Sequence, residues 1–118
     1  MKIAILDDYA GVATQLADWS GLGEISLFRD TLKDEDALVA RLAPFEILCV
    51  MRERTPLPSS IIARLPNLRL IVTTGPRNAS IDLDAAKARG ITVCGTRSRK
   101  TTTSELATTM ILALSRRL

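Results

Sequence analysis

The sequence predicts one α/β domain, a parallel β-sheet covered by helices on both faces. Short apolar, β-branched runs alternate with segments of helical spacing along the whole chain. The runs are largely apolar instead of alternating with polar residues, which is typical of strands buried on both faces. With 118 residues the chain is long enough for one domain and too short for two.

Each predicted strand is followed by a predicted helix. The strands are residues 2–6, 24–28, 46–51, 68–74 and 91–95. The helices are residues 11–19, 34–45, 57–67, 80–90 and 101–118. Because the connections are short, the strands are expected to form a doubly wound, five-stranded parallel sheet in the order 2-1-3-4-5, as in flavodoxin. Ligands of such sheets bind at the carboxyl ends of the strands.

The first two helices are predicted from their apolar spacing. In residues 11–19 the apolar positions are Val12, Leu16 and Trp19. Residues 34–45 begin with acids and end at Pro44, and both features are typical of helix termini. The apolar stripe of this second helix is Leu38, Val39 and Leu42.

Capping signals predict the later helices. The helix at 57–67 is expected to be capped by Ser59 or Ser60. The helix at 80–90 has acids in its first turn, bases in its last turn and a glycine at its end, in agreement with the helix dipole. These residues are Asp82, Asp84, Lys87, Arg89 and Gly90. The long last helix is expected to begin near Thr102 or Thr103.

Composition excludes several classes of function. The net charge is +3, from 16 basic and 13 acidic residues of interspersed sign, so no nucleic-acid partner is indicated. No apolar run approaches the roughly 20 residues that cross a bilayer, and no long signal core is found, so a cytoplasmic protein is expected. Cys49 and Cys94 lie in apolar runs and are predicted to be reduced core residues. The absence of histidine removes the commonest general base and metal ligand.

The acidic pair Asp7 and Asp8, at the end of the first strand, is similar to the start of a phosphate-receiver domain. That chemistry also needs an acceptor aspartate at the end of the third strand and a hydroxyl after the fourth. Thr73 or Thr74 supplies the hydroxyl, but Met51 stands where the acceptor is required. The pair is therefore interpreted as capping or turn-forming residues.

The chain has no convincing nucleotide-binding motif. The Gly-x-Gly of SGLGEI precedes a strand and lacks the third glycine of a dinucleotide fingerprint. Gly11 is the one glycine of the first strand-to-helix loop, and no Walker loop or metal-ligand cluster is found. A cofactor site is therefore not predicted within these residues.

Three loops at the carboxyl edge of the predicted sheet carry positive charge. Arginine forks and turn amides bind small carboxylates or phosphates, so a pocket for such an anion is predicted there. The alternative is a solvated basic rim. The residues are Arg52 and Arg54 after the third strand, Gly75 and Arg77 after the fourth, and Arg97, Arg99 and Lys100 after the fifth.

Three stretches carry a resemblance to a known family. They are MRERTPLP, NLRLIVTTGPRNASIDLDAAKARGITVCGT and TSELATTMILAL. In order and spacing they resemble the N-terminal half of the D-isomer-specific 2-hydroxyacid dehydrogenases, and the phosphoglycerate-dehydrogenase-like branch most of all. The similarity extends over essentially the whole chain.

The resemblance implies one lobe of a two-lobed oxidoreductase. Residues 1–101 would form the flavodoxin-like substrate-binding lobe, and residues 102–118 the helix that crosses to an NAD-binding lobe. The family's glycine fingerprint and its catalytic arginine, glutamate and histidine belong to that second lobe. This chain is therefore expected to contain no catalytic residue, no metal and no cofactor of its own, although the full-length family uses NAD. Glu105, at the start of the crossing helix, is expected to be structural.

The resemblance also implies substrate-binding roles. Arg52 would contact the substrate carboxylate or a distal anion, and Arg54 would assist. The loop TGPRN matches the segment whose amides bind the carboxylate, so Gly75 and Arg77 are expected donors. Pro76 shares this loop but has no N–H. A lost hydrogen bond to a charged group costs roughly 1.5–3 kcal/mol.

Two functions follow as hypotheses. The first is the substrate-binding lobe of an NAD-dependent D-2-hydroxyacid dehydrogenase, which transfers a hydride between a 2-hydroxy acid and nicotinamide and is expected to be inactive as this isolated chain. The alternative is a stand-alone module that binds small anions, or self-associates, without catalysis. Apolar residues of the last helix either pack on the domain's own sheet or join chains into a homodimer or larger oligomer. They are Met110, Ile111, Leu112 and Leu114.

Overall fold

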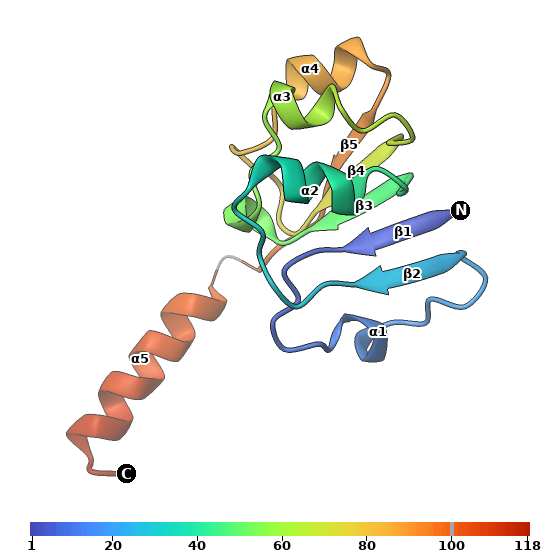
Figure 1. Cartoon of the computed structure of the whole chain (residues 1–118). Coiled ribbons are helices and arrows are strands. Elements are labelled where there is room, and N and C mark those ends of the chain that lie inside the picture. Colours follow the sequence, from blue (N-terminus) through green and yellow to red (C-terminus); the bar gives the residue numbers. More distant parts are fainter. Residues whose placement is uncertain (100) are drawn as a thin grey trace.

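The computed structural model describes residues 1–99 and 101–118 and contains one five-stranded parallel sheet (Figure 1). The strand order is β2-β1-β3-β4-β5, which confirms the predicted topology. The strands are β1 (Lys2–Ile5), β2 (Glu24–Leu27), β3 (Ile47–Val50), β4 (Leu70–Thr73) and β5 (Thr92–Gly95). The helices are α1 (Ala13–Leu16), α2 (Glu35–Leu42), the 3₁₀ turn η1 (Arg52–Arg54), α3 (Ser59–Ile62), α4 (Leu83–Ala88) and α5 (Thr102–Ser115).

The core lies between the sheet and one layer of helices. Figure 1 shows α2, α3 and α4 over one face, while the short α1 lies on the other. On the covered face Ala4, Leu48 and Ile71 stand in register on neighbouring strands and have no exposed surface. The predicted stripe of α2 packs onto this row, because Leu38, Val39 and Leu42 are all buried. Aliphatic burial of this kind is the main stabilising term of such a domain.

The opposite face of the sheet loses its cover from β1 towards β5. Ile5 is buried, Cys49 of β3 is half-buried, and Cys94 of the edge strand β5 is exposed. The prediction that both cysteines are core residues is therefore wrong for Cys94, because none of the described helices covers the edge strand on this side. Burial raises the pKa of the Cys49 thiol above its ordinary value.

The first helix is shorter than the predicted 11–19. It spans Ala13–Leu16, and the side chain of Leu16 is 78% exposed, so the helix has little apolar surface to bury. The indole N–H of Trp19 donates to the carbonyl of Ala13 at 3.0 Å, and this side-chain bond closes the segment in place of a further helical turn. The apolar spacing of residues 11–19 therefore corresponds to one short helical turn and a loop closed by the Trp19 side chain.

Aspartate side chains cap the first turns of two helices, α2 and α4. The carboxylates of Asp34 and Asp82 accept hydrogen bonds from the amides of Ala37 and Ala85, at 2.8 and 2.9 Å. The predicted serine cap of α3 is wrong. Pro58 stands at the cap position without a side-chain bond, and the Ser60 hydroxyl donates to the carboxylate of Glu35 on α2 instead.

The last helix, α5, stands away from the sheet in Figure 1. Its large apolar side chains, from Met110 at 56% exposed to Leu114 at 74%, do not pack on the domain's own sheet. The expectation that these side chains pack on the domain's own sheet is therefore wrong for this chain. Among the described residues no helix is both long enough and apolar enough to cross a membrane.

Candidate functional site

Three loops meet at the carboxyl ends of the strands. The amide of Arg52, after β3, donates to the hydroxyl of Thr74, after β4, at 3.2 Å. The guanidinium of Arg52 reaches Ser98, after β5, at 3.4 Å. In a further link, the N–H of Thr96 donates to the carbonyl of Gly75 at 2.9 Å. The predicted meeting of these three loops is thus present in the fold.

Arg52 has an unusual backbone and lies over a glycine. Its φ is +49°, in the left-handed region that only a few per cent of non-glycine residues adopt. A side chain added at Gly75 would place its Cβ 3.4 Å from Cζ of Arg52. Gly75 also has a φ of +91°. The glycine therefore permits the turn, and an added Cβ would make only ordinary van der Waals contact with the guanidinium.

Asn78, in the loop after β4, connects the same loops and was not predicted as a site residue from the sequence. Its side-chain amide donates to the carbonyl of Arg52 at 2.6 Å and to the hydroxyl of Thr73 at 3.1 Å. Its side-chain oxygen accepts from both the amide and the hydroxyl of Ser80. An asparagine this well bonded and this buried holds the turn carrying Arg52 against β4.

Only part of the loop after β4 can donate backbone hydrogen bonds to a ligand. The amide of Gly75 donates to the hydroxyl of Thr96 at 2.8 Å, and Pro76 has no N–H. The amides of Arg77 and Asn78 donate to no acceptor within residues 1–99 and 101–118. Among the described residues, the amides of Arg77 and Asn78 are therefore the two successive backbone donors that this loop leaves for a ligand.

Gly95, at the end of β5, sets how closely these loops approach. A Cβ at this position would lie 2.6 Å from the carbonyl oxygen of Pro76 and 2.9 Å from that of Gly75. Gly95 was not predicted as a site residue from the sequence, although a glycine at a strand end is a known sign of close backbone approach.

The basic residues at this edge are exposed and lack carboxylate partners. Within the described part of the chain no ion pair involves Arg52, Arg54, Arg77, Arg97 or Arg99. The remaining predicted residue, Lys100, lies outside the described residues. The loop edge is therefore cationic, with guanidinium groups that a small anion would find unpaired.

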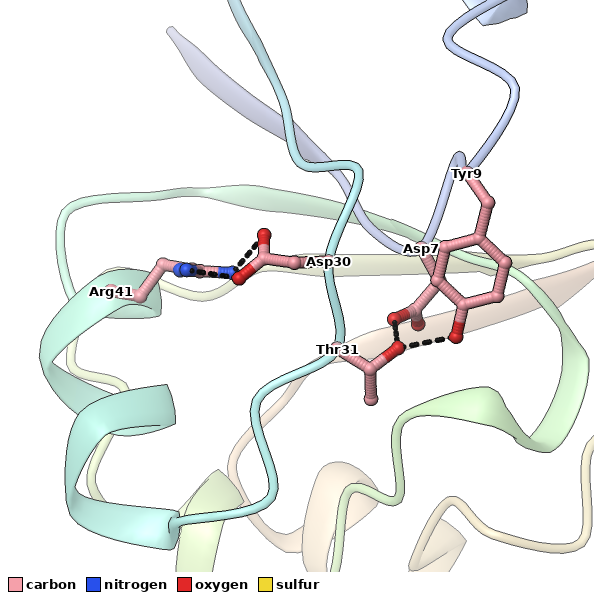
Figure 2. Close-up of polar contacts among 5 residues, drawn as sticks. All are labelled: Asp7, Tyr9, Asp30, Thr31 and Arg41. Carbon is pink, nitrogen blue, oxygen red and sulfur yellow. Dashed lines mark hydrogen bonds and ion pairs between the residues drawn. The ribbon is translucent and has the colours of Figure 1, made fainter.

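The acidic pair after β1 divides into two roles. Asp8 forms a local turn, as predicted, because its carboxylate accepts from the amides of Gly11 and Ala13 at 3.1 and 2.8 Å. Asp7 is buried among hydroxyl groups, and Figure 2 shows its contact with Thr31. Among the described residues no cluster of acids, cysteines or histidines suits a metal ion.

Two of the hollows in the described part of the chain lie at opposite ends of the strands. The larger of these two, about 710 Å³, lies at the amino ends and is lined by Met1, Glu46, Arg69 and Arg89, among others. A smaller one of about 360 Å³ lies beside the loop after β4 and is lined by Pro76, Arg77, Asn78, Leu83 and Val93, among others. We assign the site to the smaller hollow and its loops, because ligands of parallel α/β sheets bind at the carboxyl ends.

The fold defines a flavodoxin-like α/β domain, and its loop edge at the carboxyl ends of the strands is cationic. Residues 3–109 match the family described as the D-isomer specific 2-hydroxyacid dehydrogenase, catalytic domain. The chain belongs to this family, as the resemblance predicted.

Individual relatives agree with this assignment. The chain is 32% identical over 97 residues to a hydroxypyruvate reductase of Blautia hydrogenotrophica, a match that covers 79% of this chain and 29% of the relative. It is 41% identical to a phosphoglycerate oxidoreductase from Vibrio cholerae O395, with a TM-score of 0.88 over 100% of this chain and 38% of that one. A putative D-3-phosphoglycerate dehydrogenase from Ralstonia solanacearum is 33% identical, with a TM-score of 0.87 over 99% of this chain and 36% of that one.

The chain spans little more than a third of these solved relatives. More distant solved structures share the fold, and some of them contain a nicotinamide cofactor. An example is the D-lactate dehydrogenase from Aquifex aeolicus in complex with NAD and lactic acid, which is 21% identical with a TM-score of 0.66 and covers 97% of this chain and 33% of that one.

Proposed function

We propose that this chain is the substrate-binding lobe of an NAD-dependent D-2-hydroxyacid dehydrogenase, with residues 1–101 as the lobe and residues 102–118 as the helix leading to a cofactor lobe. The observation that carries the proposal is the meeting of the loops after β3, β4 and β5, linked by Arg52, Gly75 and Thr96. The ligand is a small 2-hydroxy or 2-keto acid, whose carboxylate suits the unpaired amides and guanidinium groups of this edge.

Different residues of the site bind different groups of such an acid. The amides of Arg77 and Asn78 bind the carboxylate, because those of Gly75 and Pro76 cannot. The guanidinium of Arg52, next to Gly75, binds either the same carboxylate or a second anionic group of a longer substrate. Arg54, on the same turn, assists. Because Pro76 has no N–H and the Gly75 amide is bonded to Thr96, the donor role falls to the two residues that follow the proline.

We further propose that NAD is bound outside this chain. A pyrophosphate normally sits on the amides that follow the first strand of a nucleotide-binding fold. Here the Asp8 carboxylate already accepts from the amides of Gly11 and Ala13, and the side chain of Arg29 lies within 3.1–3.3 Å of any Cβ placed at Gly11. These residues do not fit the cofactor, so no hydride-transfer step is assigned to them. Alone, the chain binds substrate and does not catalyse its reaction.

A second candidate function is self-association through α5. Five large apolar side chains of this helix are 56–74% exposed, namely Leu106, Met110, Ile111, Leu112 and Leu114. Exposed apolar surface of this kind favours pairing of chains. A homodimer through α5 would separate on Leu114→Glu substitution, which analytical ultracentrifugation would detect. A chain that is monomeric before the substitution would exclude this candidate.

Calorimetric titration of the chain with hydroxypyruvate tests the main proposal. Removing one charge-assisted hydrogen bond costs roughly 1.5–3 kcal/mol, so Arg52→Ala should weaken binding by about tenfold or more. Arg69→Ala is the matched control. Arg69 is also exposed, but it lies at the amino end of β4 and lines the hollow at the amino ends of the strands. Equal affinities of the two variants would remove Arg52 from the site.

A further inference from the structure

Asp7, just after β1, is an aspartate that is both deeply buried and left-handed in its backbone, a combination that is rare for this residue type. Its side chain is 1% exposed, and its backbone φ is +58°. One carboxylate oxygen accepts from the hydroxyl of Thr31 at 2.5 Å, and the other accepts from the hydroxyl of Thr55 at 2.7 Å. A buried carboxylate thus connects the loops after β1, β2 and β3.

The hydroxyl groups around Asp7 form a chain with one direction. A carboxylate only accepts hydrogen bonds, so the single proton of the Thr31 hydroxyl points to Asp7. The Thr31 oxygen then accepts from the hydroxyl of Tyr9, 2.5 Å away, and Figure 2 shows Thr31 between the two side chains. Tyr9 is thereby held in place over its own loop.

Both Asp7 and Tyr9 also hold Arg54. The carbonyl oxygen of Asp7 accepts from Nη1 of Arg54 at 2.7 Å. The guanidinium carbon of Arg54 lies 4.5 Å from the centre of the Tyr9 ring, a cation–π contact. One edge and one face of the guanidinium are therefore fixed, while Arg54 stays exposed on its remaining side.

The turn Arg52–Arg54 is consequently anchored at both ends. At one end, the side-chain amide of Asn78 donates to the carbonyl of Arg52. At the other end, the hydroxyl of Thr55, the next residue in the chain, donates to the carboxylate of Asp7. A left-handed non-glycine residue such as Arg52 persists only where the surrounding structure fixes it. Asp7 supplies the anchor that comes from the loop after β1.

We propose that Asp7 is a positioning residue for the anion site. Through Thr55, Tyr9 and its own carbonyl it holds the turn Arg52–Arg54, and so keeps the Arg52 guanidinium beside Gly75 and Ser98, where the loops meet. This inference rests on the proposed function of that edge, and Asp7 itself does not touch the ligand. It explains why an acid is buried at the end of β1 when phosphate-receiver chemistry is excluded.

Asp8 provides a matched control. It is adjacent in sequence, 3% exposed, and also accepts two hydrogen bonds, but these come from Gly11 and Ala13 in its own loop. Asp7→Asn and Asp8→Asn therefore remove the same charge at the same burial, and only the first touches the turn. Asparagine tolerates the left-handed backbone of position 7, so Asp7→Asn adds no backbone strain.

The experiment measures two quantities for the wild-type chain and these variants. The first is the affinity for hydroxypyruvate, and the second is the hydrogen-exchange rate of the Arg54 amide, which donates within its turn to Met51. Loss of the anchor should raise that rate by about tenfold and weaken binding by about fivefold for Asp7→Asn, with less than about twofold changes for Asp8→Asn. Thr55→Val should reproduce the Asp7→Asn result, and Thr55→Ser, which keeps the hydroxyl, should restore the wild-type values.

Equal behaviour of Asp7→Asn and Asp8→Asn in both measurements would overturn the inference, as would a Thr55→Val variant identical to wild type. A wild-type chain that does not bind hydroxypyruvate would instead refute the proposed function. In that case the exchange rate of Arg54 still decides whether Asp7 holds the turn, so the two failures are distinguishable. If Asp7→Asn does not fold, the Thr55 pair carries the same test.

Discussion

Replacing Gly95 by alanine should disturb the candidate site without touching any of its charged groups. The new Cβ would lie 2.6 Å from the Pro76 carbonyl oxygen and 2.9 Å from that of Gly75. Ordinary carbon–oxygen contacts in sheets are about 3.3–3.6 Å, so the loop after β4 would have to move by roughly 0.7 Å or more. Both contacts are to backbone, so no flexible side chain can yield in its place.

The cost of this displacement follows from overpacking. An added methyl group in a tightly packed region typically costs about 1–3 kcal/mol. For a domain of this size each kcal/mol lowers the melting temperature by roughly 3–6 °C, so a fall of about 3–18 °C is expected. Because the loop carries Arg77 and Asn78, hydroxypyruvate binding should weaken as well.

Differential scanning calorimetry and a hydroxypyruvate titration measure both effects. Gly21→Ala is the control, because Gly21 has a left-handed φ of +79° but no atom within 4 Å of an added Cβ. That variant reports backbone strain in the absence of a clash, and it should not alter binding. A Gly95→Ala variant with unchanged melting temperature and affinity would refute the close approach of β5 to the loop after β4.

Three further predictions concern the core, the thiols and an exposed ion pair. Leu42→Ala, which removes a side chain with no exposed surface, should lower the free energy of unfolding in urea by about 2–5 kcal/mol. Cys94 is exposed whereas burial raises the pKa of Cys49, so Cys94 should react much faster with Ellman's reagent near neutral pH, and Cys94→Ser should abolish the fast phase. The hydrogen bond from Arg41 lowers the pKa of Asp30 below the ordinary carboxylate value of 3.8 (Figure 2). The free energy of unfolding lost in Asp30→Asn should therefore be constant above pH 3.8. It should vanish as the pH falls through the lowered pKa of Asp30 in the folded chain. Equal reactivity of the thiols, or a pH-independent effect at Asp30, would contradict the burial and the pairing described here.

The strand order was predictable because it depends on patterns that extend over many residues. Five apolar runs separated by helical segments permit few arrangements other than a parallel sheet, and right-handed crossovers reduce these further. The location of the site followed from the same topology, since all carboxyl strand ends share one edge. Arg52 and Gly75 were named for that reason, and the structure places them together.

The contacts that build the site could not be read from the sequence. Asp7 bonds to Thr31 and Thr55, which are 24 and 48 residues away, and no local pattern connects them. The hydroxyl of Thr96 engages the amide of Gly75 across 21 residues. Such pairings depend on how the loops fold over the strand ends, and a single sequence contains no direct signal of that.

The errors at α1 and Cys94 have a common physical origin. Apolar spacing predicts a buried face only where another layer is present to cover it. On the side of the sheet away from α2, α3 and α4, the described part of the chain has only the short α1, which leaves Leu16 78% exposed and does not extend over the edge strand β5. The sequence pattern was therefore read as burial at places where the fold supplies no partner surface.

The central claim is that a small organic acid binds where the loops after β3, β4 and β5 meet. The most direct test is a titration of the ¹⁵N-labelled chain with hydroxypyruvate, in which amide chemical shifts are followed by NMR. The largest shifts are predicted at Arg52, Arg77 and Asn78. Shifts concentrated instead at Glu46, Arg69 and Arg89, around the hollow at the amino ends of the strands, would contradict the assignment of the site.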